Sequence, residues 1–207
     1  MIDTEVRKML EKPLARAAEA LDVRWISPNR LTLAGLAIGL SSAALAASQL
    51  WVAALLAWLL SRVFDGLDGA LARRRRSNSD PDSEVGGFLD IMADFIVYGA
   101  GVFGVAVGAT TGYGAPWWPF LLVLLAYYLN GAAFLAFSSI AERTDRRIED
   151  GRSLSFLGRV AEGAETIAVH ALWMLLPGHA WMIAVAWAAL VFVSAVERMI
   201  SAVRILR

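Results

Sequence analysis

The chain has 207 residues, of which 58% are hydrophobic and 18% are charged, and this composition excludes an ordinary soluble globular domain. Its 19 basic and 19 acidic side chains cancel, so no net field points to nucleic acid or to an acidic tail. The absence of cysteine excludes disulfides, thiolate metal ligands and a cysteine nucleophile. The positions of the charges are therefore more informative than their number.

The first segment of the chain mixes apolar and basic side chains. Between Glu5 and Leu21, leucines and alanines alternate with lysines and arginines, which predicts an amphipathic helix lying on the cytoplasmic membrane surface. We expect Pro13 to interrupt this helix or to restart it. Residues 1–28 are assigned to this juxtamembrane segment, and residues 29–207 to a transmembrane domain.

Three long stretches, 31–61, 95–141 and 166–196, contain no Asp, Glu, Lys or Arg. Each is long enough to cross a membrane, which takes about 20 residues of helix. Turn-forming residues divide each stretch, at Ser48-Gln49, at Thr110–Pro119 and at Pro177–His179. The sequence therefore predicts an all-α membrane protein with six transmembrane helices, near residues 31–49, 51–72, 87–109, 117–141, 160–176 and 180–203.

The basic residues predict how these helices are oriented. They lie in the N-terminal arm, in residues 62–76, in residues 143–159 and near the C-terminus, and the three remaining connections have none. By the positive-inside rule, both termini and the two basic loops are cytoplasmic. Four tryptophans at the opposite helix ends agree with an aromatic belt. We expect an integral membrane protein of a bacterial inner membrane, with its active site facing the cytoplasm.

Two features are interpreted as packing rather than binding. The small-residue spacings Gly35-x-x-x-Gly39 and Gly104-x-x-x-Gly108 are typical of helices that approach closely in a membrane. His170 has no potential co-ligand near it in the sequence, so we expect a packed or hydrogen-bonded core residue rather than a metal ligand.

Four acidic residues lie where a membrane helix should be uncharged: Asp65 and Asp68 near the end of the second predicted helix, and Asp90 and Asp94 near the start of the third. Burial of an ionisable group in a membrane is costly without compensation, so these residues are functional candidates. Steps of three and four residues place each pair on one face of its helix. A short loop joins the two helices, so both faces can meet near the cytoplasmic surface.

Carboxylates without His or Cys are typical of a site for a hard cation such as Mg²⁺ or Mn²⁺. Two such ions about 4 Å apart would offset the repulsion and form a clamp for phosphoryl transfer. Alternatively, the acids only form ion pairs with Arg62 and with the run Arg73–Arg76. This alternative is less favourable, because four facing acids stay costly in a bundle even when they are paired.

Small residues lie among the acids. Gly69, Ala72 and Gly86 leave room for a ligand to approach the backbone. Arg73 follows Gly69 by one helical turn, where a guanidinium can contact a phosphate.

The two half-motifs together resemble the signature of the CDP-alcohol phosphatidyltransferases, D-x2-D-G-x2-A-R-x8-G-x3-D-x3-D. In this chain they run from Asp65 to Arg73 and from Gly86 to Asp94. Twelve residues, rather than eight, separate Arg73 from Gly86, and we attribute the difference to a longer cytoplasmic loop. The segment Pro28-Asn29-Arg30-Leu31-Thr32 is also similar to the Pro-Asn-x-Leu-Thr entry to the first helix of the family.

The resemblance implies a homodimeric membrane enzyme of phospholipid biosynthesis. Such an enzyme transfers a phosphatidyl group from CDP-diacylglycerol to the hydroxyl of a small polar alcohol and releases CMP, with two divalent ions, Mg²⁺ or Mn²⁺. By motif position, the metal ligands would be Asp65, Asp68, Asp90 and Asp94, with Asp94 also acting as the catalytic base. The residues that bind the CDP-linked donor would be Asn29, Gly69, Ala72, Arg73 and Gly86.

The acceptor alcohol should bind near the metals, among the last three predicted helices. The candidates are Asn130, Arg159, Glu162 and Glu165. The last three recur at helical spacing on one face, which could bind a polar headgroup, and Arg159 could bind its phosphate. An equally acceptable interpretation is a set of ion pairs at the membrane interface, where charges at helix ends cost little.

Two other functions compete with this interpretation. A CDP-choline or CDP-ethanolamine enzyme would transfer its headgroup to a lipid alcohol, although such enzymes usually resemble longer chains. A divalent-cation transporter would also use aspartates in the membrane, but it would need polar groups along a path through the whole bilayer. Here the acids gather on one side. The acceptor stays open among glycerol phosphate, serine, inositol phosphate and other alcohols.

Overall fold

The computed structural model describes residues 2–23, 25–75, 82–144 and 163–206. The described residues form helices and no strand, as expected for an all-α protein. The elements are α1 (Ile2–Ala20), α2 (Pro28–Ala47), α3 (Trp51–Arg75), α4 (Asp82–Tyr113), α5 (Trp118–Arg143), α6 (Gly163–Leu175), the 3₁₀ turn η1 (Pro177–His179) and α7 (Ala180–Leu206).

The three expected turns are confirmed. The chain reverses after α2 at Gln49, whose φ of 61° is left-handed, and after α4 at Gly114, whose φ is 67°. Glycine adopts this conformation without strain, which is why it commonly ends a helix. Between α6 and α7 the direction changes in η1, which begins at Pro177. Each predicted membrane segment corresponds to one helix, with most ends within a few residues of the expected ones.

Two helices differ from the prediction. α1 continues through Pro13, so the expected interruption is wrong. Pro13 is exposed, and its ring therefore does not disturb the face that packs on the rest of the protein. α4 begins at Asp82 rather than at residue 87 and continues to Tyr113, where the left-handed glycine ends it.

Four of the described helical segments are long and apolar enough to cross a membrane: Pro28–Ala47, Glu84–Tyr113, Trp118–Arg143 and Pro177–Leu206. They support an integral membrane protein. α3 is also long, but it carries Arg62, Asp65 and Asp68 within its length. The described part of α6 has 13 residues, fewer than the roughly 20 that a simple span requires.

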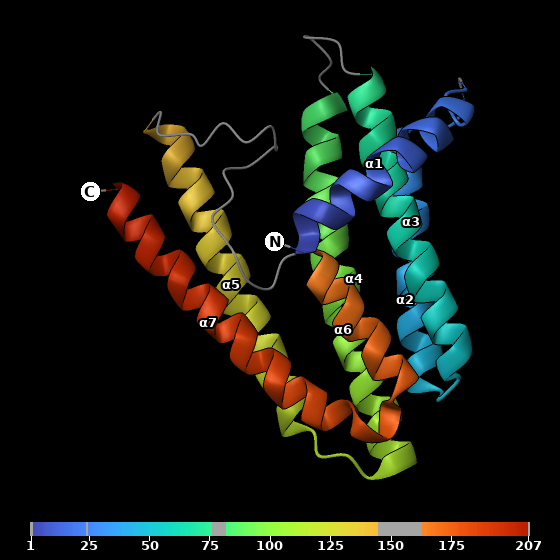
Figure 1. Cartoon of the computed structure of the whole chain (residues 1–207), viewed down its shortest axis with the longest axis vertical. Helices are drawn as coiled ribbons and strands as arrows, with labels where there is room; N and C mark the ends of the chain where they lie inside the picture. The colour runs from blue at the N-terminus through green and yellow to red at the C-terminus, as the bar shows by residue number, and fades with distance from the viewer. Residues whose placement is uncertain (1, 24, 76–81, 145–162, 207) are drawn as a thin grey trace.

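The helices form two groups. α2 packs against both α3 and α4, α6 lies against α3, and α1 crosses α3 and α6. α5 and α7 form a separate pair that diverges from α4 toward the end of the molecule where both of them finish (Figure 1). The turns after α2, α4 and α6 gather at the opposite end. We call the end where α3, α5 and α7 finish and α4 begins the charged end.

Aromatic residues fill the core between these groups. Trp58 and Trp173 are fully buried, and the Trp58 indole donates a hydrogen bond to the Ile167 carbonyl at 3.1 Å, which ties α3 to α6. His170 is also fully buried, and its Nε2 lies 3.2 Å from the hydroxyl of Tyr127 on α5. The expectation that His170 is a hydrogen-bonded core residue is confirmed.

The small-residue spacings are confirmed as packing surfaces. Gly104 and Gly108 of α4 face the backbone of α2, where a Cβ atom would fall onto the carbonyl oxygens of Ala43 and Ala46. The two backbones can therefore approach because neither glycine has a side chain.

We predict that Gly104→Ala lowers the stability of the protein by about 3 kcal/mol, the upper part of the range for overpacking, because backbone atoms must move. Gly99→Ala on the same helix is the matched control, since a Cβ there meets nothing within 4 Å. This control should be neutral or stabilising by about 0.5–1 kcal/mol, because alanine favours helix. Thermal unfolding in detergent measures both. Equal unfolding temperatures for the two variants would contradict the close packing of α2 and α4.

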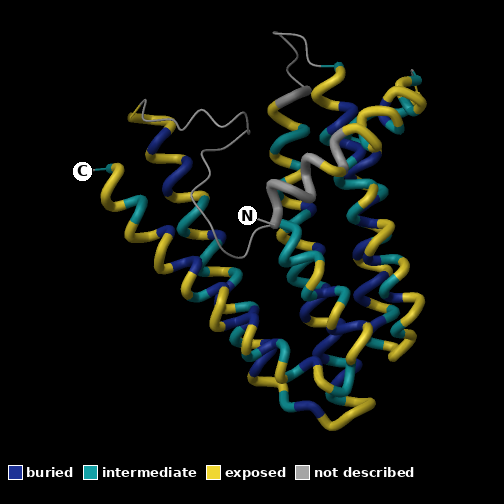
Figure 2. Tube along the Cα trace, in the orientation of Figure 1, coloured by how far each residue is buried: buried dark blue, intermediate teal, exposed yellow. Residues whose placement is uncertain are grey.

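Apolar side chains also cover much of the outer surface. Exposed residues run along the outward faces of α3, α5 and α7 in Figure 2, and they include Leu56, Leu59 and Leu60 on α3 and Leu121 and Leu125 on α5. A surface this apolar is unfavourable in water and suits the hydrocarbon region of a membrane.

Candidate active site

The four predicted acids come together at the charged end. Asp65 and Asp68 lie on α3, and Asp90 and Asp94 on α4. The Asp65 carboxylate interacts electrostatically with the other three, and Asp68 and Asp90 each interact with Asp94. α3 and α4 both pack on α2, so α2 holds the two acidic faces opposite each other. We call these four residues the acidic cluster.

Arg62 spans from α3 to α4 within this cluster. Its Nη1 atom donates a hydrogen bond to Asp94 Oδ1 at 2.8 Å and lies 3.6 Å from Asp65 Oδ1. The two carboxylates therefore lie on either side of one guanidinium nitrogen. The ion pairing that the alternative interpretation expected is therefore present for Arg62. Arg74 and Arg75 pair with other acids, and Arg76 lies outside the described residues.

Asp68 is the most deeply buried member of the acidic cluster, with 4% of its surface exposed. The Thr32 hydroxyl on α2 donates a hydrogen bond to its Oδ2 at 2.5 Å. Thr32 lies one turn after Ser27 and Pro28. These residues begin α2, because the Ser27 side chain accepts a hydrogen bond from the Arg30 amide and Pro28 stands at the first helical position. The start of α2 thereby fixes one side chain of the cluster.

The donor atoms of the acidic cluster are those of a divalent-ion site, but their arrangement is not. All four side chains offer carboxylate oxygens, which Mg²⁺ and Mn²⁺ prefer. Within the described ranges, no three acidic or histidine side chains form a ready coordination shell, and Asp94 faces Arg62 instead. An ion held by three or more of these side chains would therefore require them to rotate.

The residues predicted to bind a CDP-linked donor meet in two pairs. On α3, a Cβ at Gly69 would lie 3.3 Å from Nη1 of Arg73, so the guanidinium lies over the glycine. Between α2 and α4, a Cβ at Gly86 would lie 3.1 Å from Oδ1 of Asn29. Ala72 is exposed on α3. All five residues lie near helix ends at the charged end of the bundle.

The acceptor candidates are only partly described. Arg159 and Glu162 lie outside the described residues. Asn130 of α5 and Glu165 of α6 each have a buried side-chain oxygen without a hydrogen-bond partner, Oδ1 and Oε2 respectively. The residue after Asn130, Gly131, packs so closely on the Phe95 ring that a Cβ would overlap it. Asn130 is thus next to α4 at the level of the acidic cluster.

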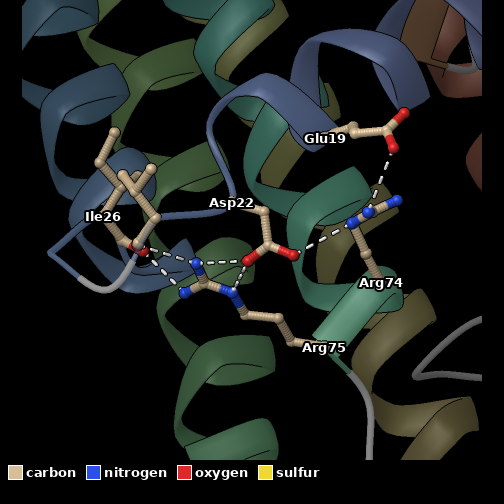
Figure 3. Close-up of polar contacts among 6 residues, drawn as sticks. Glu19, Asp22, Ile26, Arg74 and Arg75 are labelled. Atoms are coloured by element: carbon tan, nitrogen blue, oxygen red, sulfur yellow. Dashed lines mark hydrogen bonds and ion pairs between the residues drawn. The ribbon is translucent and has the colours of Figure 1, made fainter.

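Two further arginines fasten α1 to α3. As Figure 3 shows, Arg75 donates to Asp22 Oδ1 at 2.7 Å and to the Ile26 carbonyl, while Arg74 reaches Asp22 Oδ2 at 3.0 Å and Glu19 at 3.5 Å. We call these contacts the α1 latch. The latch holds α1 across α3.

The latch brings α1 next to the acidic cluster. A Cβ at Gly66 would lie 3.1 Å from Cδ1 of Leu14, and Gly66 directly follows Asp65. Within the arginine run, Arg74 and Arg75 thus serve as contacts between helices.

We predict that the α1 latch opens in acid. Arg75, and then Arg74, lower the pKa of Asp22 below its ordinary value of 3.8. Because the pKa of this carboxyl is lowered by folding, its contribution is complete above the ordinary pKa and is lost as the pH falls through the lowered value. Spin labels on Met9→Cys and Val63→Cys, in a chain without other cysteines, should keep their distance from pH 7 to about pH 4 and separate below it.

Asp22→Asn is the control for the α1 latch, because it removes the titrating group. It should show a broadened distance already at neutral pH. An unchanged distance in this variant would show that α1 is held by its apolar contacts alone.

Two residues at the site received no catalytic or ligand-binding role from the sequence, where Arg62 was named only as a possible ion-pair partner. Arg62 lies three residues before Asp65, which places it on the same helical face, and this spacing was the available signal. Thr32 was part of a recognised segment, but its bond to Asp68 joins residues 36 positions apart, which no local pattern indicates.

Comparison with known proteins extends over most of the chain. The family described as CDP-alcohol phosphatidyltransferase matches residues 25–196. The inner membrane protein YnjF of Escherichia coli is 36% identical over 185 residues, which are 87% of this chain and 84% of that protein. Archaetidylinositol phosphate synthase of Pyrococcus horikoshii is 30% identical over 150 residues, which are 70% of this chain and 78% of that protein.

A solved structure has the same fold. It is the crystal structure of Mycobacterium tuberculosis phosphatidylinositol phosphate synthase (PgsA1) with CDP-DAG bound, which aligns with a TM-score of 0.60 over 96% of this chain and 92% of that one. The two sequences are 20% identical.

The apolar helices and the acidic cluster define an integral membrane protein with an oxygen-donor site at one end of its helix bundle. The family match over most of the length makes the class specific: the chain belongs to the CDP-alcohol phosphatidyltransferase family. The expectation of a transferase of this class, drawn from the resemblance of residues 65–94 to the family signature, is confirmed.

Proposed function

We propose that this enzyme transfers a phosphatidyl group from CDP-diacylglycerol to the hydroxyl of a small polar alcohol, with release of CMP. The observation that carries the proposal is the meeting of Asp65 and Asp68 with Asp90 and Asp94 across α3 and α4. The donor is supported by the PgsA1 structure, whose description names CDP-DAG. The relatives named as inositol phosphate synthases make a phosphorylated polyol the first acceptor to test.

Each group of site residues has a separate task in the proposed reaction. The acidic cluster would hold two divalent ions, Mg²⁺ or Mn²⁺, which when bound neutralise the diphosphate and stabilise the charge that develops on departing CMP. Arg73 would bind the diphosphate through its guanidinium. Gly69, Ala72 and Gly86 would leave space for the nucleotide, and Asn29 would contact it.

The chemical step follows from this arrangement. The acceptor hydroxyl oxygen forms a bond to the β-phosphorus of the donor, and the bond from that phosphorus to the oxygen of CMP breaks. Asp94 accepts the hydroxyl proton as the attack proceeds. Asn130, Arg159, Glu162 and Glu165 would orient the acceptor. The buried unpartnered oxygens of Asn130 and Glu165 suit hydroxyl groups, which can donate to them.

In the proposed topology, residues 29–207 cross the membrane six times. Four spans are the apolar helical segments named above, and α3 and α6 are the other two. Residues 1–28, including α1, would lie at the cytoplasmic interface. Both termini and the acidic cluster would then face the cytoplasm, in agreement with the positive-inside rule. The active form would be a homodimer.

The experiment is a CMP-release assay with purified protein in detergent. The donors are CDP-diacylglycerol and CDP-choline. The acceptors are inositol phosphate, glycerol phosphate, serine, inositol and the lipid alcohol diacylglycerol, and Mg²⁺ or Mn²⁺ is added or chelated. Release that requires CDP-diacylglycerol, one alcohol and the metal supports the proposal. Release only from CDP-choline with a lipid alcohol would instead favour a headgroup transferase.

A further inference from the structure

Arg62 is the cation inside the acidic cluster. Only 7% of its side chain is exposed. Nη1 bonds to Asp94 Oδ1 and lies near Asp65, and Nη2 donates to the Ser61 hydroxyl at 3.0 Å. Arg62 lies three residues outside the recognised signature, which begins at Asp65, and the proposed transfer reaction gives it no task.

Two aromatic rings hold the Arg62 guanidinium in place. Its central carbon lies 5.1 Å from the ring centre of Trp58 and 5.1 Å from that of Tyr98, and Nη1 lies 3.5 Å from the Tyr98 hydroxyl. Such cation–π contacts are strongest when they are shielded from water. The guanidinium therefore has a fixed position between α3 and α4.

The aromatic rings are themselves supported from behind. The Trp58 ring stacks on His170 with the ring centres 4.5 Å apart, and Tyr98 meets His170 edge-on at 5.5 Å. His170 is bonded to Tyr127, whose hydroxyl accepts a hydrogen bond from Trp187 Nε1 at 2.8 Å. The position of Arg62 thus depends on side chains from α3 to α7, and a displacement of the guanidinium would disturb the aromatic core.

A fixed guanidinium beside these carboxylates must affect any ion that they bind. Arginine stays protonated at all ordinary pH values, so its positive charge is permanent. An ion held by Asp94 and Asp65 would lie close to this charge in surroundings with little water, where like charges repel strongly. Arg62 also occupies Asp94 Oδ1, which leaves Oδ2 as the oxygen offered to an ion or to a hydroxyl proton.

We infer that Arg62 is a positioning residue that orients the Asp94 carboxylate and, as a competing cation, weakens the hold of Asp94 on a divalent ion. The inference deepens the proposed function and rests on it. Arg62 thereby gives Asp94, the base, a different role from the other three members of the acidic cluster, which act only as metal ligands.

The test measures Mn²⁺ binding by electron paramagnetic resonance with the full-length protein in detergent, independently of turnover. Arg62→Met and Arg62→Gln remove the charge, and Arg62→Lys keeps it. We expect Mn²⁺ to bind about tenfold more tightly to the two neutral variants, because a nearby positive charge is gone. The lysine variant should bind Mn²⁺ within about twofold of wild type by the same reasoning. All three should release CMP more slowly.

The direction of the change distinguishes this role from a purely structural one. Loss of local structure would weaken Mn²⁺ binding, so equal or weaker binding by Arg62→Gln would overturn the inference. If Arg62→Met does not fold, Arg62→Gln still decides, since it keeps a donor for Asp94. The tightening should also vanish when Asp94→Asn is combined with the neutral variant. A tightening that persists would place the effect elsewhere.

Failure of the proposed function gives a different pattern. Wild-type protein would then bind no Mn²⁺ at the acidic cluster, Asp90→Asn would make no difference, and no CMP would be released. This result would overturn both ideas. Wild-type Mn²⁺ binding with unchanged affinity in the neutral Arg62 variants would overturn only the role of Arg62.

Discussion

Replacing Asp94 by asparagine is expected to reduce the rate of CMP release by about a thousandfold, which is within the range attributed to general-base catalysis. Asparagine has nearly the same shape, but its amide accepts no proton from the acceptor alcohol. Arg62 keeps Asp65 as a nearby partner at 3.6 Å, so the buried guanidinium is not left without an acid. The variant should therefore fold and still bind CDP-diacylglycerol.

Three measurements check this prediction: CMP release at saturating substrate, binding of radiolabelled CDP-diacylglycerol, and thermal unfolding. Glu84→Gln is the matched control, because Glu84 is an exposed carboxylate on the same helix and lies at a position that the family signature leaves unspecified. It should release CMP at the wild-type rate. Wild-type turnover in the Asp94 variant would remove Asp94 from the reaction, and loss of donor binding would indicate a mainly structural role.

Removal of the Arg73 side chain is expected to lower kcat/KM for CDP-diacylglycerol by about 30- to 100-fold, corresponding to the loss of charge-assisted hydrogen bonds to a phosphate. Arg73 lies over Gly69 on α3, with no part in the α1 latch. The next residue, Arg74, is in that latch with Asp22. The two adjacent arginines therefore have different surroundings, so the kinetic effect of replacing one can be compared with the effect of replacing the other.

The assay varies the CDP-diacylglycerol concentration at a fixed acceptor concentration for Arg73→Ala and Arg74→Ala. The Arg73 variant should show most of its loss in KM for the donor, whereas the Arg74 variant should change it by less than about threefold, as for an exposed ion pair. Gly69→Val is an independent check, since a larger side chain displaces the guanidinium and should mimic Arg73→Ala. Equal effects of the two arginine substitutions would mean that the basic charge of this segment matters, rather than the position of Arg73.

Much of this architecture could be predicted from local patterns. Polar and turn-forming residues such as Ser48 and Pro177 divide the apolar stretches, and the turns lie there because such residues end helices. The four aspartates could be placed on facing helices because their spacing of three and four residues is the spacing of one helical face. The family signature followed from the same residues.

Other features depend on contacts between distant parts of the chain. Arg62 could be placed on the face of Asp65, but its reach to Asp94 depends on how α2 separates α3 and α4. The partner of Arg75 could not be chosen among many acids, because charge alone does not identify Asp22. α1 stays helical through Pro13, although a proline inside a helix removes one backbone hydrogen bond, and no local pattern predicts this outcome.

The contact between α2 and α4 affects the distances between the residues of α2 and α4 at the candidate active site. Where Gly104 and Gly108 meet the Ala43 and Ala46 carbonyls, no side chain is present whose rotamer could change to absorb a shift. The axial position of α4 relative to α2 is therefore set by backbone atoms. The contact at Gly104 lies 14 residues, or about 21 Å, along α4 from Asp90. The alignment of the Asp90 and Asp94 carboxylates with the start of α2 therefore depends on this distant backbone contact, because a rigid helix carries any shift at Gly104 along its length.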